Sequence, residues 1–282
     1  MSPKSKSNIL ILFLGISIIL IAVALGVIIQ KKYYSQDTQD TQHIKYSIVN
    51  NSLHYNVLYS IDMPNYTIPI QVNVNTSSHE GDISLKITTV TDNEYKSLNV
   101  VNTTHNVTIN NNGKIIALEP SEIIPEVWPE YPVNVILQDK SIKKGDAWTV
   151  PINEKRAYNL SRYIINYTIM GENNYKCTDF DNVTINNNTF YCAVINANLN
   201  YNVNMISRDN QSDVYTSIIY KSQSTNWINV ENGVIIKIKN NIAEKSSYNL
   251  SEPYKNAGIS TGNVLQTIST KEQTLWELQQ EG

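Results

Sequence analysis

Hydrophobic and polar residues alternate with a period of two along most of this chain. The clearest case is Tyr191–Met205, in which every second residue is apolar or aromatic and most of the residues between are asparagines. Because successive side chains of a strand point to opposite faces, this pattern predicts a long antiparallel strand with one buried and one wet face. At about 3.3 Å per residue the strand would extend roughly 50 Å, so we expect it to bend within a strongly curved sheet.

The same alternation recurs before and after this strand. It predicts a mainly β ectodomain, a strongly curved antiparallel β-sheet that is half-barrel or sandwich-like, with little helix. The Pro-rich stretch 119–132 interrupts the pattern and could divide the β region into two parts. Residues 256–282 mix apolar and charged positions, which we interpret as a partly helical tail. The further predicted strands are Leu53–Tyr59, Thr67–Val74, Ile83–Ile87, Tyr163–Ile169, Val214–Tyr220 and Val234–Lys239.

The N-terminal region differs from the rest because Ile9–Ile29 contains no charged residue. A helix of this length covers about 31 Å, which matches the hydrocarbon core of a bilayer. A cleaved signal peptide is the alternative, since Ala22–Ala24 resembles a cleavage site, but the apolar run continues beyond that site. We therefore expect an uncleaved transmembrane anchor. The predicted order is a cytoplasmic N-terminus 1–8, a transmembrane helix 9–29, a polar tether 30–43, a β-rich ectodomain 44–255 and the tail 256–282.

Sequons for asparagine-linked glycosylation favour a β region that lies outside the cell. The lysines on the two sides of the apolar segment are nearly balanced, so the positive-inside rule alone does not orient it. The sequons fall in predicted loops, strand ends or wet strand positions, as glycan acceptors should. We therefore predict a single-pass membrane protein with its N-terminus inside and its C-terminal domain outside. The candidate acceptors are Asn50, Asn65, Asn75, Asn102, Asn106, Asn159, Asn166, Asn182, Asn187, Asn210 and Asn249.

The two cysteines, Cys177 and Cys192, flank a segment that contains a turn-like run of asparagines. We interpret this segment as two neighbouring strands joined by a loop, with a disulfide bond between the cysteines. Closing a loop of about 15 residues would contribute roughly 3 kcal/mol, and a disulfide would suit an oxidising exterior. A metal-binding or redox pair is the alternative, but no second cysteine pair and no nearby histidine supports it.

Composition and motifs argue against several classes of function. The 22 basic and 25 acidic residues are well mixed along the chain, which argues against a nucleic-acid partner. No nucleophile, P-loop, zinc or dinucleotide motif occurs, and the 4 histidines are far apart, so we predict no catalytic residue, no cofactor and no metal site. Oxygen-rich stretches at 179–182 and 209–213 offer calcium ligands, but they lack the glycine and the bidentate glutamate of an EF-hand loop.

A local pattern in the second half of the chain resembles a known type of exported domain. The element Lys144–Trp148 (Lys-Gly-Asp-Ala-Trp) is followed by Trp227 and by the turn Glu231–Val234. Residues 113–250 thereby resemble uncharacterised exported domains with a curved, half-barrel sheet, which are similar in architecture to lipoprotein-carrier-like folds. That resemblance implies a concave face that can hold lipid. The anchor, the sequons and the Asn-, Ile- and Tyr-rich composition are also similar to those of surface proteins of methanogenic archaea, which implies a location without an activity.

Together these features predict a non-enzymatic, membrane-anchored extracellular surface or envelope protein that acts as an interaction or structural module. The expected partners are the membrane and either lipid or another surface protein. The alternative function is that of a binder or carrier of lipid, or of another apolar ligand, on the concave face, because one sheet face is lined with Tyr, Ile, Val and Leu. An enzyme such as a hydrolase and a domain that faces the cytoplasm are the remaining interpretations.

Overall fold

The computed structural model describes most of the chain in several stretches. The chain splits into two compact units, Met1–Thr41 and Gln42–Gly282, and the second contains every described strand. The predicted cytoplasmic N-terminus, the transmembrane helix and the tether up to residue 40 lie outside the described residues. Within the described stretches no helix is long and apolar enough to cross a membrane. These stretches are 41–47, 50–61, 67–79, 81–91, 104–119, 135–160, 163–208, 213–258 and 265–281.

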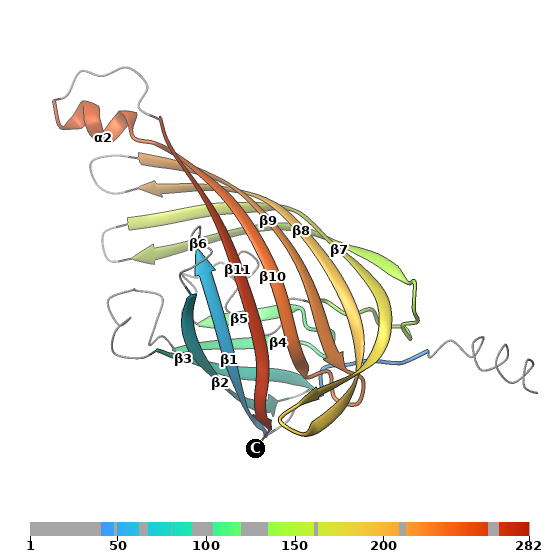
Figure 1. The fold of residues 1–282 in the computed structure, drawn as a ribbon. Helices are drawn as coiled ribbons and strands as arrows, with labels where there is room; N and C mark the ends of the chain where they lie inside the picture. Colours follow the sequence, from blue (N-terminus) through green and yellow to red (C-terminus); the bar gives the residue numbers. More distant parts are fainter. Residues whose placement is uncertain are drawn as a thin grey trace, which may run out of the picture. The chain divides into compact units, whose positions relative to one another are not determined.

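The second unit is one antiparallel sheet, with eleven strands among the described residues (Figure 1). Its strands are β1 (Ser52–Ile61), β2 (Thr67–His79), β3 (Asp82–Thr91), β4 (Thr104–Ile109), β5 (Ile115–Glu119), β6 (Ala147–Leu160), β7 (Tyr163–Ile185), β8 (Asn188–Arg208), β9 (Asp213–Asn229), β10 (Ile235–Asn249) and β11 (Leu265–Glu281). The sheet order is β5-β4-β3-β2-β1-β11-β10-β9-β8-β7-β6. The first and last strands therefore pair in the interior, and β5 and β6 are the two edges. The mainly β, antiparallel prediction is confirmed.

Strands β7 and β8 form one long hairpin. Asn186 and Asn187 make its turn with φ angles of 49° and 67°, the left-handed conformation that a two-residue hairpin turn requires. A bulge between Cys177 and Asp179 interrupts the ladder. Strand β8 has 21 residues, and it curves together with its neighbours in Figure 1, as its length led us to expect.

The sheet has a buried inner face and a solvated outer face. In β8, Ile195 and Tyr201 are buried on the inner face, whereas Asn196 and Asn202 are exposed on the outer face. Removing the apolar inner-face side chains from water is the main force that favours this fold. The period-two pattern of the sequence corresponds directly to these two faces.

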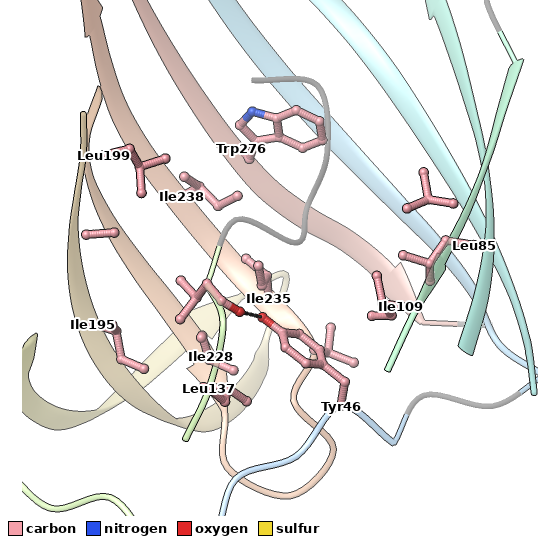
Figure 2. Packing of buried hydrophobic residues seen from close by; sticks show 14 of the residues in the cluster. Tyr46, Leu85, Ile109, Leu137, Ile195, Leu199, Ile228, Ile235, Ile238 and Trp276 are labelled. Carbon is pink, nitrogen blue, oxygen red and sulfur yellow. Dashed lines mark hydrogen bonds between the residues drawn. The ribbon is translucent and has the colours of Figure 1, made fainter. Parts of the chain in front are cut away.

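Two segments outside the sheet, around Tyr46 and around Val135, cover one end of the inner face (Figure 2). The Tyr46 hydroxyl donates a hydrogen bond of 2.9 Å to the carbonyl oxygen of Val135. Gln42 and Ile142 join the same two segments through an isolated antiparallel bridge, with N···O distances of 2.8 and 2.7 Å. The covered end is an apolar core that includes Leu137, Ile228 and Ile195 (Figure 2).

The predicted disulfide bond is wrong, because Cys177 and Cys192 are both free and buried. The ladder pairs Cys177 with Ile195, and Cys192 with Asp181. Since Cys192 and Ile195 are three residues apart in one strand, their side chains point to opposite faces, and so the two thiols lie on opposite sides of the sheet. Their separation along the ladder is about 10 Å, which no disulfide spans. The prediction that two neighbouring strands flank the loop is confirmed.

The C-terminal segment also differs from the prediction. Residues that we expected to form a partly helical tail form β11, which pairs with β1 on one side and β10 on the other. The helix α2 (Ser251–Asn256) precedes it and has only 6 residues. Most of the stretch 119–132, where we considered a subdivision, lies outside the described residues, but β5 before it and β6 after it belong to the same sheet.

Candidate functional site

The middle of the inner face is polar, in contrast to the apolar core at its covered end. Asn240 of β10 lies opposite Ser224 of β9 on one side and opposite Thr274 of β11 on the other. All three side chains are buried, with exposed fractions of 6% or less. We call the buried polar residues of this region the polar belt: Asn173, Ser222, Ser224, Asn226, Asn240 and Thr274.

Hydrogen bonds within the polar belt offset much of the cost of burying it. The Ser222 hydroxyl donates to Asn240 Oδ1 at 2.7 Å. The Asn226 amide donates to Ser224 Oγ at 2.9 Å and to the carbonyl oxygen of Ile195 at 3.1 Å. A buried amide or hydroxyl with such partners is tolerated in a protein interior, whereas an unpaired one is costly.

Among the described residues, two atoms of the polar belt are without a hydrogen-bond partner. They are Thr274 Oγ1 and Asn226 Oδ1. Leaving a buried polar atom unpaired costs about 1–3 kcal/mol, and native structures contain few such atoms. A hydrogen-bonding group from outside the chain would remove this cost, so these two atoms favour the binding of a polar partner at the belt.

Two half-buried carboxylates, Glu244 of β10 and Glu272 of β11, border the polar belt. The charged residues on the described inner face of β7–β11 are these two glutamates. Glu244 lies opposite Tyr220 of β9, whereas Glu272 lies opposite Ile242 of β10. Burial raises the pKa of the Tyr220 hydroxyl; hydrogen bonding to Ser222 opposes this change, and repulsion from Glu272 and Glu244 adds to it. Glu244 is therefore directly beside Tyr220 in the sheet, and Glu272 lies beyond Ile242, two residues further along the same face.

The described glycosylation candidates lie on the outer face of the sheet or at strand ends and turns. Seven of them are described with their side chains, and all seven are exposed: Asn50, Asn75, Asn106, Asn166, Asn182, Asn187 and Asn249. Asn159 lies in β6, and Asn65, Asn102 and Asn210 lie outside the described residues. Exposure is what a glycan acceptor requires.

A shallow groove of about 460 Å³ crosses β2, β3, β4 and β5 on the outer face. Lys86 of β3 lies between Asn75 of β2 and Asn106 of β4, and all three line the groove. The remaining lining residues are mostly small and polar. Since two sequon asparagines flank Lys86, a glycan on either of them would lie over this groove.

The other candidates for chemistry are distributed singly. Asp179, in one of the oxygen-rich stretches, forms an ion pair of 2.9 Å with Lys144, and this hydrogen bond lowers the pKa of its carboxyl group. Burial raises the pKa of the Cys177 thiol to about 11 and that of the Cys192 thiol to about 12, so neither thiol ionises near neutral pH. In the described part of the chain, no group of three or more His, Cys, Asp or Glu side chains could hold a metal ion.

The pattern of the sequence did not point to the polar belt. Glu272 and Thr274 belong to the segment that we interpreted as a partly helical tail. Ser222, Ser224 and Asn226 lie in the largely polar run of β9, in which polar residues occupy both faces. The alternation Thr274-Trp276-Leu278 against Gln273-Leu275-Glu277 is a signal that could have identified β11 as a strand.

Comparisons with known proteins give no family for this chain. No family model matches it, and no curated protein does. Among solved structures, one match is the hypothetical lipoprotein YmcC from Escherichia coli K12, with 10% sequence identity, coverage of 85% of this chain and 90% of that chain, and a TM-score of 0.26. Neither the identity nor the TM-score is high enough to transfer a property from that protein to this chain.

Proposed function

We propose that this chain is a non-enzymatic surface protein, held in a membrane by the apolar segment Ile9–Ile29 and displaying its β-sheet unit outside the cell. The observation that carries this proposal is the contrast between the two faces of the sheet. The inner face is largely buried, whereas the seven sequon asparagines whose side chains are described are exposed to solvent. A sheet with this arrangement presents a broad, hydrophilic surface that can carry glycans and contact other surface molecules.

Glycopeptide mass spectrometry on the full chain, purified from the membranes of its native cells, tests this function. We expect glycan masses on sequon asparagines such as Asn166, Asn182 and Asn187. Asn196 is the matched control, because it is exposed on the same face as Asn166 but is not followed by the sequon residues. Protease treatment of intact cells is the second measurement, and we expect it to digest the β-sheet unit. The proposal is contradicted if no sequon carries a glycan and if proteases digest the chain only after cell lysis.

A second function is supported by the polar belt. A sheet face that served only as a core would be apolar throughout, whereas this one contains the unpaired Thr274 Oγ1 and two half-buried carboxylates beside apolar residues. Binding of an amphipathic small molecule on the inner face would pair the polar groups and also contact the apolar ones. Isothermal titration of the full chain in lipid nanodiscs with octanol tests this function, with empty nanodiscs subtracted. Saturable binding of octanol supports this function, and the absence of binding would contradict it.

A further inference from the structure

We propose that the outer face of β9–β11 binds an acidic polysaccharide through a cluster of exposed lysines. This inference rests on the first proposed function, in which the outer face contacts other surface molecules, and it names the chemical class of one such partner. We call the cluster the lysine patch: Lys221, Lys239, Lys245 and Lys271. Charge, spacing and neighbouring amide groups each support the proposal.

The lysine patch makes this face positive, although the chain as a whole has a formal charge of −3. Strands β9, β10 and β11 lie side by side in the sheet (Figure 1), and each of their lysines is on the outer face. Of the two acidic side chains described on this face of the three strands, Asp213 pairs with Arg208 at 2.8 Å. The other, Glu277, pairs with Lys237 at 2.6 Å. A surface of one sign attracts a partner of the opposite sign, which here is a polyanion.

The spacing of three of these lysines suits a single anionic group. Lys221 of β9 and Lys271 of β11 lie opposite Ala243 of β10, one on each side. Lys245 is two residues from Ala243 on the same face, so it is a diagonal neighbour of both lysines, at about 7–8 Å between Cα atoms. Ala243 is exposed and has a small side chain, so a carboxylate can approach the middle of this triangle and accept hydrogen bonds from the ammonium groups around it.

A row of amide side chains lies next to the triangle. Gln223, Asn241 and Gln273 are opposite one another in β9, β10 and β11, and all three are exposed. Asn198 of β8 extends the row, since it lies opposite Gln223. An amide both donates and accepts hydrogen bonds, as the hydroxyl groups of a sugar also do. Lysines for a carboxylate and amides for hydroxyl groups together match a polymer of acidic sugars.

Two other features favour a polysaccharide over a nucleic acid or a membrane surface. The lysine patch and the amide row contain neither arginine nor an aromatic side chain, on which base recognition and membrane insertion commonly depend. The sequon of β9–β11 is at Asn249, the final residue of β10, so no glycan acceptor of these strands lies within the patch.

Binding of a linear oligogalacturonate, a chain of uronic acids, tests the inference, with the full chain in phosphatidylcholine nanodiscs and isothermal titration as the measurement. A malto-oligosaccharide of equal length is the neutral comparison, and we expect the oligogalacturonate to bind about tenfold more tightly. Lys221→Gln and Lys245→Gln should each weaken its binding by about threefold, and the double substitution should remove most of the preference. Lys114→Gln is the matched control, because Lys114 is exposed between β4 and β5.

The outcomes separate this inference from the function on which it rests. Equal binding of the charged and the neutral oligosaccharide would overturn the inference, as would a preference that survives the double substitution. Tighter binding of a DNA duplex or of phosphatidylserine vesicles than of the oligogalacturonate would also overturn it. None of these results bears on the location of the sheet, which glycopeptide analysis and protease treatment of intact cells test without a ligand. Each substitution replaces an exposed side chain, so we expect every variant to fold.

Discussion

The hydroxyl group of Tyr46 donates a hydrogen bond of 2.9 Å to the carbonyl oxygen of Val135, which lies 89 positions later in the chain. Both groups are buried, and neither segment belongs to the sheet. This contact therefore joins two non-sheet segments over one end of the inner face. Burial raises the pKa of Tyr46 strongly, so its hydroxyl stays protonated and able to donate at physiological pH.

The substitution Tyr46→Phe should destabilise the fold. It removes the donor and leaves the buried carbonyl oxygen of Val135 without this partner, at a cost of about 1–3 kcal/mol. Chemical denaturation of both proteins measures the change in the free energy of unfolding. Tyr215→Phe is the control, because Tyr215 is 48% exposed and should change stability by less than about 0.5 kcal/mol. Equal effects of the two substitutions would show that the Tyr46 contact contributes nothing measurable.

The two cysteines should behave as buried, reduced thiols. Under native conditions a thiol reagent should react slowly with both, because each is buried and burial raises the pKa of Cys177 to about 11 and that of Cys192 to about 12. In denaturant without reductant, both should react quickly, and the mass should increase by two adducts. If the denatured chain takes up no adduct until it is reduced, the two cysteines form a disulfide bond, and the register given above is wrong.

His105 should make stability depend on pH. Burial lowers its pKa in the folded state below 6.5, its value when exposed. Its contribution is therefore complete above pH 6.5 and declines as the pH falls from 6.5 toward the folded-state pKa, because the unfolded chain then binds the proton more readily. The free energy of unfolding should fall more steeply between pH 7 and pH 5 for the unsubstituted chain than for His105→Leu. Parallel pH profiles for the two proteins would contradict this account.

Gly171 should not tolerate a larger residue. It lies opposite Tyr201 in the β7–β8 ladder, and a Cβ atom at this position would overlap the carbonyl oxygen of Asn200 and the Tyr201 side chain. We expect Gly171→Ala to lower the free energy of unfolding by about 1–3 kcal/mol, since backbone atoms cannot move aside easily. Glu172→Ala, at the exposed neighbouring position, is the control and should have little effect. A stabilising Gly171→Ala would show that this part of the ladder is looser than described.

Much of the fold was predictable because alternation reports which face is buried. Strand β8 shows this best, since nearly every inner residue is apolar and most outer residues are asparagine. Strand β11 was missed for the opposite reason: its inner positions include Thr270, Glu272 and Thr274, so polar residues occupy both faces of its first half. Thr274, one of the polar residues that obscure this pattern, also belongs to the polar belt.

The disulfide prediction failed for a reason of geometry. Cysteines on two strands of one hairpin can be bonded only if they lie opposite each other on the same face. The register depends on the turn at Asn186 and Asn187 and on the bulge after Cys177, and neither can be read from the spacing of the cysteines alone. Alternation within β8 did indicate that Cys192 and Ile195 point to opposite faces.

The most direct test of the central claim, an exported sheet with a solvated outer face, is cysteine labelling on intact cells. Asn198→Cys places one thiol on the exposed outer face of β8, while the native cysteines are buried and should contribute little background. A membrane-impermeant maleimide should label this variant on intact cells as fully as in lysate, and it should leave the unsubstituted chain unlabelled. Labelling that appears only after lysis would place the sheet inside the cell and contradict the account.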